Sequence, residues 1–300
     1  MYIFTRLFVA TTFALMTSTS IAQSDALDDV EELKITALEA LMAAPPERAL
    51  PLLSKVIEGE SSDDVKERAL FVLSQIDLPE AQALLLETAR QGSGELRLEA
   101  IRMIGIGGGP AALSGLAELY GMGDGDVREA VLQAYLIADD SNAVYEIAAS
   151  AESEEDFEEA IEILAAMDAR EELRMLRNRA GMSETLIQAY AISGDFETLR
   201  ELSMDGSNPQ QQAQATQALG IVGGAESNTA LVEIYRSSDS PDVREAALDG
   251  LLISGHDEGV LQLYRSSQDP VEKRELLEYL VMMESEAIWD VIGSALDSER

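Results

Sequence analysis

The sequence has little of what catalytic and metal sites are usually built from. Its 300 residues include no cysteine, one tryptophan and one histidine, His256. The lack of cysteine excludes disulfides, thiol chemistry and a lipid-anchored amino-terminal cysteine. With one histidine, the common zinc sites and nucleophile–base pairs cannot be assembled, and the carboxylates are too numerous for one pair to stand out. We therefore predict a protein that is not an enzyme and has no catalytic residue, metal or cofactor.

Positive charge is also scarce. The chain has 21 Lys and Arg against 56 Asp and Glu, which gives a net charge of −35. Such a surface repels nucleic acids and anionic membranes, and it favours basic proteins or divalent cations as partners. The simpler interpretation is solubility in salty surroundings, which needs no specific partner. Asp124 and Asp126 could contact calcium, but their spacing does not match the known calcium-binding loop.

Long apolar runs are missing as well, since a membrane span takes about 20 apolar residues. The run from Leu7 to Met16 is shorter; it follows Arg6 and precedes the small residues Ser20-Ile21-Ala22. This order is typical of a cleavable secretory signal peptide. We predict a signal peptide over residues 1–22, cleaved after Ala22, and a periplasmic location in a Gram-negative bacterium, with release from the cell as the alternative.

What the sequence does have is a pattern that returns about every 30 residues. Most copies start at an apolar anchor, such as Val65 or Val243, and have further apolar or small residues four, five and eight positions later. These offsets lie on one face of an α-helix. The anchors are Val65, Leu96, Val127, Phe157, Met182, Gln211, Val243 and Val271. A fixed period of this length predicts an all-α fold, an α-solenoid of stacked antiparallel helix pairs.

A second apolar period follows each of these first helices. It starts after a proline or a glycine, as at Pro79, Pro110 and Gly224, because glycine commonly ends helices and proline is favoured in their first turn. We also predict that an aspartate just before an anchor caps the first helix. The candidate caps are Asp64, Asp126 and Asp242.

The repeats resemble HEAT repeats of the short kind found in phycobilisome-lyase-type proteins. The resemblance is carried by Asp126-Val127-Arg128-Glu129-Ala130 and by Asp242-Val243-Arg244-Glu245-Ala246, with Lys66 and Arg97 in the same basic position of two other copies. The match is poor between residues 150 and 205. The resemblance implies about nine helix pairs and a structural ladder of these basic residues, paired with the aspartates that precede the anchors.

The predicted solenoid covers residues 23–300. Terminal repeats lack one neighbour and need a covering element. We predict that a helix pair over residues 25–60 caps the amino end. A helix over residues 284–298, which contains the only tryptophan, Trp289, would cap the other end.

One segment runs against the general acidity. Arg170, Arg174 and Arg177 are spaced to share a helix face, and Arg179 lies close by. Their guanidinium groups could dock a carboxylate, phosphate or sulfate group of a partner. The alternative is neutralisation by acids of the preceding helix, which would lie antiparallel beside it. Those acids are Glu152, Glu154, Glu155, Asp156, Glu158, Glu159 and Glu162.

Three tyrosines, Tyr120, Tyr235 and Tyr264, occupy matching positions on second helices. Second helices usually line the concave side of a HEAT array, so these tyrosines could form a partner-binding ladder. The alternative is packing between repeats with the hydroxyl at the rim, because Leu116–Tyr120 and Leu231–Tyr235 have core spacing.

Together these features predict an exported, non-catalytic HEAT-repeat scaffold that mediates protein–protein interaction. The expected partner is another periplasmic or envelope protein with a basic or extended segment. Two alternatives stay open. The resemblance implies a bilin-lyase-like or maturation-factor activity, chaperone-like and cytoplasmic, but the predicted signal peptide contradicts that compartment. The other is an acidic envelope protein that binds divalent cations.

Overall fold

The computed structural model describes residues 29–180 and 183–297. The predicted signal peptide, residues 1–22, and the anchor Met182 lie outside the described residues. The described part is largely helical and contains no strand. None of its helices is both long and apolar enough to cross a membrane. The helices group into two compact units, unit 1 up to Asp140 and unit 2 from Ser141, and a single stack over residues 23–300 stays a prediction.

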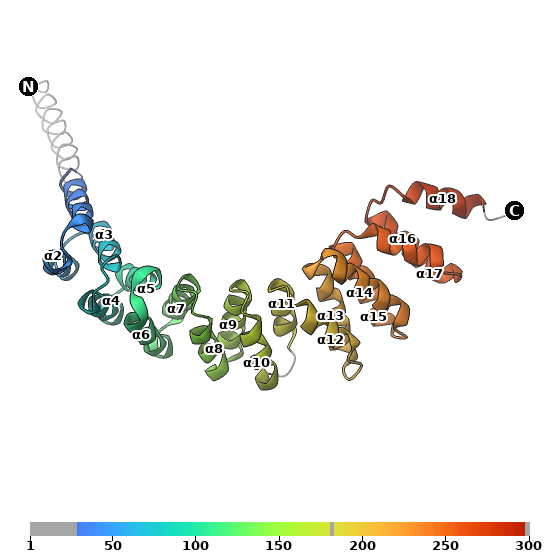
Figure 1. Cartoon of the computed structure of the whole chain (residues 1–300), viewed down its shortest axis with the longest axis horizontal. Coiled ribbons are helices and arrows are strands. Elements are labelled where there is room, and N and C mark those ends of the chain that lie inside the picture. The colour runs from blue at the N-terminus through green and yellow to red at the C-terminus, as the bar shows by residue number, and fades with distance from the viewer. Residues whose placement is uncertain (1–28, 181–182, 298–300) are drawn as a thin grey trace, which may run out of the picture. The chain divides into compact units, whose positions relative to one another are not determined.

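Unit 1 starts with a helix over residues 29–40 and a short 3-10 helix, Leu41–Ala43. Its further helices are α2 (Pro46–Glu58), α3 (Asp63–Ser74), α4 (Pro79–Gln91), α5 (Glu95–Gly107), α6 (Gly109–Met122) and α7 (Gly125–Ile137). The first helices α3, α5 and α7 pack on one another in order, and the second helix α4 packs on α6. Figure 1 shows α4 and α6 on one side of α3 and α5. The unit is therefore a two-layered stack of helical hairpins.

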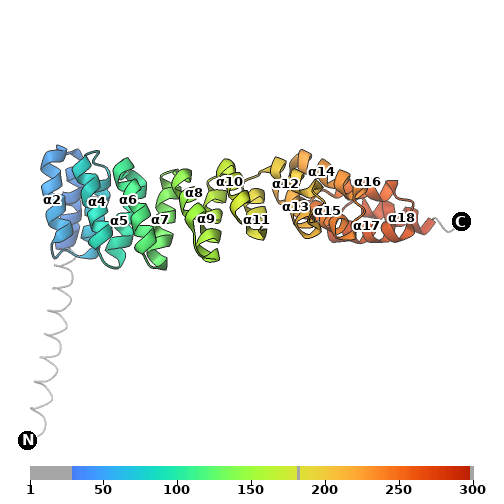
Figure 2. The ribbon, with the colours of Figure 1, turned by 90° about the horizontal axis from the view of Figure 1, so that it is seen from below.

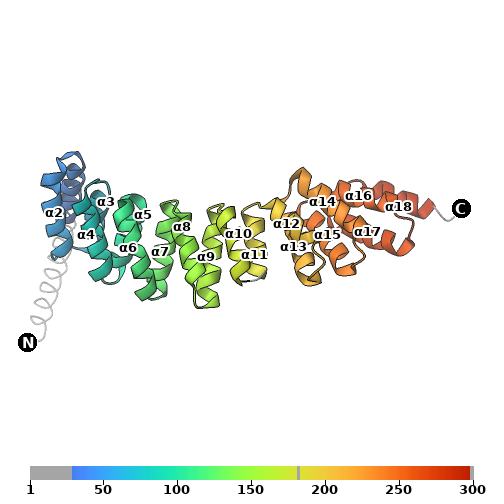
Figure 3. The ribbon, with the colours of Figure 1, turned by 60° about the horizontal axis from the view of Figure 1, so that its bottom comes forward.

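Unit 2 repeats this plan. Its helices are α8 (Ser141–Ser150), α9 (Glu154–Ala166), α10 (Arg170–Ala180), α11 (Glu184–Ile192), α12 (Phe196–Met204), α13 (Pro209–Val222), α14 (Gly224–Ser237), α15 (Pro241–Ile253), α16 (Asp257–Ser266), α17 (Pro270–Met282) and α18 (Ile288–Asp297). The first helices α9, α11, α13, α15 and α17 pack in sequence. In Figure 2 they form one layer, and the second helices α10, α12, α14 and α16 form the other. Figure 3 shows the same alternation.

The predicted repeat sets the core. In α3 the anchor Val65 and the residues four and eight positions later, Ala69 and Leu73, are all fully buried. The same is true of Val243 and its two partners in α15. The predicted α-solenoid is thus confirmed as the fold. The last anchor, Val271, is 61% exposed, and it belongs to the terminal repeat, where covering neighbours are fewest.

The predicted capping by aspartates is wrong in position. Asp64, Asp126 and Asp242 lie inside the first turns of α3, α7 and α15, because each helix begins two residues earlier than expected. The residue that caps α7 is Asp124, whose Oδ1 accepts from the backbone N–H of Val127 at 3.2 Å. An acid inside the first turn still stabilises the helix through its macrodipole.

Two fully buried tyrosines, eight positions after their anchors, tie first helices to the preceding second helix. The hydroxyl of Tyr135 donates to the carbonyl oxygen of Leu113 at 3.1 Å. The hydroxyl of Tyr190 donates to the carbonyl oxygen of Leu173 at 3.1 Å. Burial raises the pKa of each phenol to about 12. One hydrogen bond per phenol satisfies the polar group that packing has removed from water.

Adjacent first helices come closest at glycines near their carboxyl ends. A Cβ atom at Gly220 of α13 would lie 2.3 Å from the carbonyl oxygen of Gly250 in α15. In unit 1, a Cβ at Gly105 of α5 would lie 2.7 Å from Cα of Ala134 in α7. The carboxyl ends of neighbouring first helices therefore lie side by side, which means that these helices run parallel.

Candidate partner-binding site

The arginine-rich helix α10 reaches toward the helix pair that follows it. Arg170 donates from Nε to the carbonyl oxygen of Ser193 at 2.7 Å and to Oδ1 of Asp168 at 2.8 Å. Nη1 of Arg177 lies 3.4 Å from Oε1 of Glu201 on α12. The side chain of Arg179 lies outside the described residues.

Arg174 makes the best-formed ion pair of this group. Its Nη2 lies 2.5 Å from Oδ1 of Asp195, and its Nε lies 2.7 Å from Oδ2. The Asp195 side chain is only 1% exposed, whereas that of Arg174 is 47% exposed. Asp195 also caps α12, accepting from the backbone N–H and the hydroxyl of Thr198. A buried carboxylate therefore fixes both the start of α12 and the direction of Arg174.

Two opposing effects act on the pKa of Asp195. Burial raises it, because a charged carboxylate loses its hydration. The hydrogen bonds from Arg174 and Thr198 and the charge of Arg174 lower it. The second group of effects is stronger, so the pKa lies below the usual value and the carboxylate is ionised at neutral pH.

The arginines are neutralised within the protein, as the alternative interpretation predicted, but not by the acids that it named. Arg170, Arg174 and Arg177 meet oxygen atoms at Asp168 and in the following pair, not the expected acids Glu152 to Glu162 of the preceding segment. Glu158, for example, accepts a hydrogen bond from Thr185 at 2.9 Å. The reason is that the arginine face of α10 turns toward α12.

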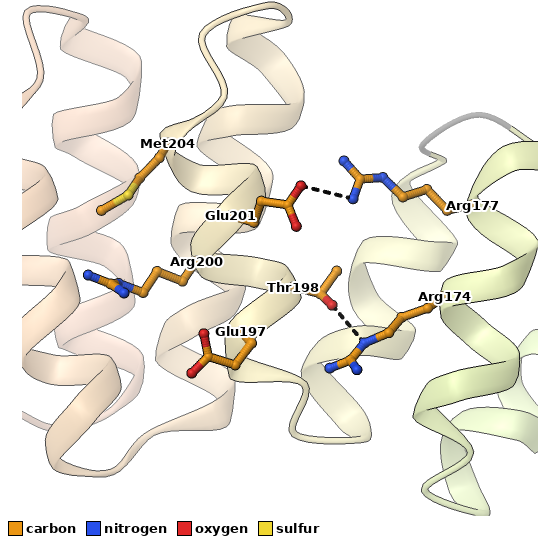
Figure 4. Close-up of a pocket in the computed structure, with 7 residues that line it drawn as sticks. All are labelled: Arg174, Arg177, Glu197, Thr198, Arg200, Glu201 and Met204. Carbon is orange, nitrogen blue, oxygen red and sulfur yellow. Dashed lines mark hydrogen bonds and ion pairs between the residues drawn. The ribbon is translucent and has the colours of Figure 1, made fainter.

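A groove of about 980 Å³ lies along α10 and α12. It is lined by Arg174, Arg177, Glu197, Thr198, Arg200, Glu201 and Met204. Figure 4 shows Thr198 and Glu201 pointing toward α10, while Arg200 and Met204 extend from the other side of α12. A second groove of about 480 Å³ between α12 and α14 shares Glu197 and Arg200 with the first.

Arg200 differs from its neighbours on α10. It lines both grooves, and its guanidinium makes no hydrogen bond or ion pair with any residue that the structure describes. Arg174 is held by Asp195, and Arg177 is paired with Glu201. The uncompensated cation of the groove is therefore Arg200, and an anionic group of another molecule could pair with it.

The three predicted tyrosines are covered by cations of the next first helix. Tyr235 is 3% exposed, and its hydroxyl accepts from Nη2 of Arg244 at 2.8 Å. The guanidinium of Arg128 lies 5.7 Å from the ring centroid of Tyr120, and Nζ of Lys273 lies 5.3 Å from that of Tyr264. Burial removes Tyr235 from the predicted partner-binding surface, whereas Tyr120 and Tyr264 are half-buried.

The predicted basic ladder also has partners other than the expected aspartates. Arg244 pairs with Glu272 on α17 as well as with Tyr235, and not with Asp242. Arg97 donates from Nε to the carbonyl oxygen of Ala89 at 3.0 Å. Ala89 stands where the next repeat has Tyr120. Arg97, Arg128 and Arg244 thus connect their first helices to the second helix before each, which is a packing role.

Sequence reasoning missed Asp195, Arg200 and Glu201. The spacing of Asp195 and Thr198 is that of a helix cap, so this pattern could have located the start of α12. No pattern shows which arginine lacks a partner, because that depends on how neighbouring helices face one another. Among the described residues, no group of three or more His, Asp or Glu side chains could hold a metal ion.

Comparison with known proteins supports the repeat assignment. Residues 50–136 match the family model described as HEAT repeats. Human deoxyhypusine hydroxylase in complex with glycerol is similar in structure, with 21% identity, a TM-score of 0.36, and coverage of 87% of this chain and 94% of that one. The complex of CpcE and CpcF of phycocyanin lyase from Nostoc sp. PCC7120 gives 17% identity, a TM-score of 0.34, and coverage of 78% and 94%.

No curated protein matches the sequence. At these identities and TM-scores the two solved structures carry no argument about this chain. The chain is a helical-repeat protein, and its residues 50–136 are similar to HEAT repeats.

Proposed function

We propose that this protein is an exported, non-catalytic scaffold, and that the groove along α10 and α12 binds an extended segment of another periplasmic or envelope protein. The observation that carries the proposal is the position of Arg200, which lies in the groove without a charge partner among the described residues. A carboxylate of the bound segment would pair with its guanidinium.

The arrangement around Arg200 suits such a segment. Arg174 and Arg177 lie on the wall opposite Arg200 and are held by their ion pairs with Asp195 and Glu201. Their guanidinium groups therefore keep a fixed direction along the groove. Met204 is 56% exposed at the edge, and its flexible thioether can contact side chains of different shapes. Binding would then combine one charge-assisted contact with apolar contact, as in other peptide-binding grooves.

The remaining surface limits the choice of partner. With a net charge of −35, the chain repels acidic proteins at long range and attracts basic ones. The partner that fits best is basic over most of its surface and contributes a single carboxylate, of a side chain or of its carboxyl terminus, to Arg200. Export rests on the amino-terminal pattern that ends at Ala22. The intact mass of the mature protein tests it, since retention of residues 1–22 would contradict a cleaved leader.

A pull-down from envelope extract tests the scaffold. The wild-type protein, the variant Arg200→Glu and the control variant Arg265→Glu would each be immobilised, and captured proteins identified by mass spectrometry. Arg265 is exposed on α16, away from the groove residues. Replacing it by Glu changes the net charge by the same amount as Arg200→Glu does. We expect wild type and R265E to capture the same partner, and R200E to capture at least about tenfold less.

Consistent recovery of nothing by the wild-type protein would refute the scaffold proposal. Equal recovery by R200E and R265E would refute the groove as its binding site. Circular dichroism of all three proteins shows whether the variants remain folded, so that a loss of binding can be assigned to the charge.

A further inference from the structure

A row of exposed apolar residues marks the ends of the first helices in unit 2. The residue ten positions after the anchor is Ile192 in α11, Ile221 in α13, Ile253 in α15 and Val281 in α17. Their exposures range from 50% to 64%. Single exposed apolar side chains are common on proteins. Four at the same position of four consecutive repeats form a continuous feature, which we call the apolar row.

The geometry of the helices places these residues side by side. The four helices pack in sequence, and α13 and α15 make backbone contact at Gly220 and Gly250, next to Ile221 and close to Ile253. Because the helices run parallel, their carboxyl ends lie at one edge of unit 2. The apolar row therefore follows that edge from one repeat to the next.

A row of acids accompanies it. Five positions after each member of the apolar row stands a glutamate at or near the start of the second helix of the pair. These residues are Glu197, Glu226, Glu258 and Glu286. All four are exposed, and none makes a side-chain hydrogen bond or ion pair with the described residues. We call them the acidic row. An acid in a first turn also stabilises its own helix, but that role does not require an apolar neighbour.

Two first helices of unit 1 have the apolar residue without an acid five positions later. Ile106 of α5 and Ile137 of α7 occupy the same place in their repeats and are 45% and 49% exposed. Five positions later stand Ala111 and Asn142. The combination of both rows therefore belongs to unit 2, and the two isoleucines of unit 1 supply a matched internal control.

We propose that the two rows of unit 2 together bind a cationic amphipathic helix of a partner protein, an inference that rests on the proposed scaffold function and names a second surface for it. The apolar row would contact a leucine- or isoleucine-rich stripe of that helix. The acidic row would face lysines and arginines on the adjacent stripe. Charge complementarity selects this partner over an acidic helix or an anionic membrane.

The spacing of the repeats supports a helical partner. Packed helices lie about 8–10 Å apart, so one member of the apolar row follows another at about that interval. Seven residues of an α-helix advance about 10.5 Å and return nearly to the same face. A partner helix of at least about 22 residues, with apolar positions one heptad apart, would therefore match all four members of the row. An extended strand alternates its faces at every residue and offers no such match.

A labelled synthetic peptide tests the proposal with the full-length protein. The peptide has about 22 residues, with heptad-spaced leucine along one stripe and lysine along the next, and a second peptide has the same composition in scrambled order. Fluorescence anisotropy at low ionic strength gives the two dissociation constants. We expect the patterned peptide to bind at least tenfold more tightly than the scrambled one.

Variants locate the binding surface. Ile221→Gln with Ile253→Gln should weaken binding of the patterned peptide at least tenfold. Glu226→Gln with Glu258→Gln should weaken it severalfold and reduce its salt dependence. Ile106→Gln with Ile137→Gln should leave it unchanged. The proposal is overturned if the scrambled peptide binds equally well, or if I221Q/I253Q binds like wild type.

Two other occupants give different outcomes, and either result would overturn the proposal. If the row joins two copies of this chain, light scattering shows a wild-type dimer that I221Q/I253Q converts to a monomer. If the row contacts lipid, the wild-type protein sediments with phosphatidylcholine vesicles and the variant does not.

The two proposals can fail separately. If R200E loses the partner captured from extract while the patterned peptide behaves as expected, both surfaces stand. If the extract yields no partner but the peptide binds as expected, the scaffold proposal fails and the rows stand as a helix-binding surface. If the partner is captured but the peptide does not bind, the apolar and acidic rows are refuted and the scaffold remains.

Discussion

Unit 2 uses two different ways to join neighbouring helices of the same layer. Between α13 and α15 the backbones touch, because Gly220 and Gly250 have no side chains to separate them. Between α10 and α12 the link is made by charged side chains, chiefly Arg174 with Asp195. The first contact leaves no space for a side chain between the two helices, and the second leaves room for a groove. One stack can thus contain two kinds of contact between successive helices of a layer, which we call joints. One is tightly packed, and the other is open and polar.

The difference explains where a groove lined by charged groups can form. The α13–α15 contact at Gly220 and Gly250 is made by backbone atoms, so at that point it presents no charged group to a ligand. The α10–α12 joint holds its helices apart by the length of an arginine side chain. Arg177, Arg200 and Glu201 then line an accessible surface.

The largest effect should follow from filling the backbone contact. In the variant Gly220→Ala, the new Cβ would lie 2.3 Å from the carbonyl oxygen and 2.5 Å from Cα of Gly250. The helices must move apart, and overpacking of this kind costs about 3 kcal/mol in free energy of unfolding. Urea unfolding followed by circular dichroism measures the change.

Gly121→Ala is the control for this variant. Gly121 is in α6, and a Cβ there would meet nothing within 4 Å. Alanine is the better helix former, so G121A should stabilise by about 0.5 kcal/mol. If G220A stabilised the protein as much as G121A does, the α13–α15 contact would have room for a methyl group. The contrast between the two joints would then be wrong.

The polar joint should give a smaller loss. The variant Asp195→Ala removes the cap of α12, worth about 1 kcal/mol, together with the ion pair of a half-exposed arginine. We expect a total of about 2 kcal/mol from urea unfolding. Glu201→Ala removes an exposed pair with Arg177 and should change stability by less than about 0.5 kcal/mol. Equal effects of D195A and E201A would show that burial of Asp195 does not matter.

The same pair predicts a dependence on pH. The pKa of Asp195 is lower in the folded chain than in the unfolded chain, where it is about 4. Its contribution is therefore fully present above about pH 4 and is lost as the pH falls through the folded-state pKa. The stability difference between wild type and D195A should be the same at neutral and mildly acidic pH, and it should shrink below about pH 4. A difference that grew on acidification would contradict the assigned charge state.

Much of the fold could be predicted from the sequence, because burial in a solenoid repeats with the helix period. The pattern at Val65 and Val243 located first helices whose anchors are fully buried. Helix starts were less accurate. Asp242 looked like a cap, but Pro241 already begins α15. The helix period is a property of each segment alone, whereas an N-terminal cap depends on the one residue at which the chain enters the helix.

The site was predicted only in part. The shared helix face of Arg170, Arg174 and Arg177 was visible in the sequence, but the acids that they meet were not, because the direction of that face depends on the rotation between successive pairs. Tyr235 was recognised as a candidate, yet its contact with Arg244 across helices requires the structure. Contacts between repeats therefore carry the information that a single-sequence pattern lacks.

The smallest expected effect tests whether buried tyrosines act alike in both units. Tyr190→Phe in unit 2 and Tyr135→Phe in unit 1 each remove one hydroxyl that donates to a second-helix carbonyl. Each should cost about 1 kcal/mol at neutral pH. Because burial raises both pKa values to about 12, the unfolded chain loses its phenolic protons first, near pH 10, and wild-type stability falls as the pH rises above that value. Each variant should show a smaller alkaline loss in urea unfolding. If Y190F alone differed from wild type, the two units would use this tyrosine differently.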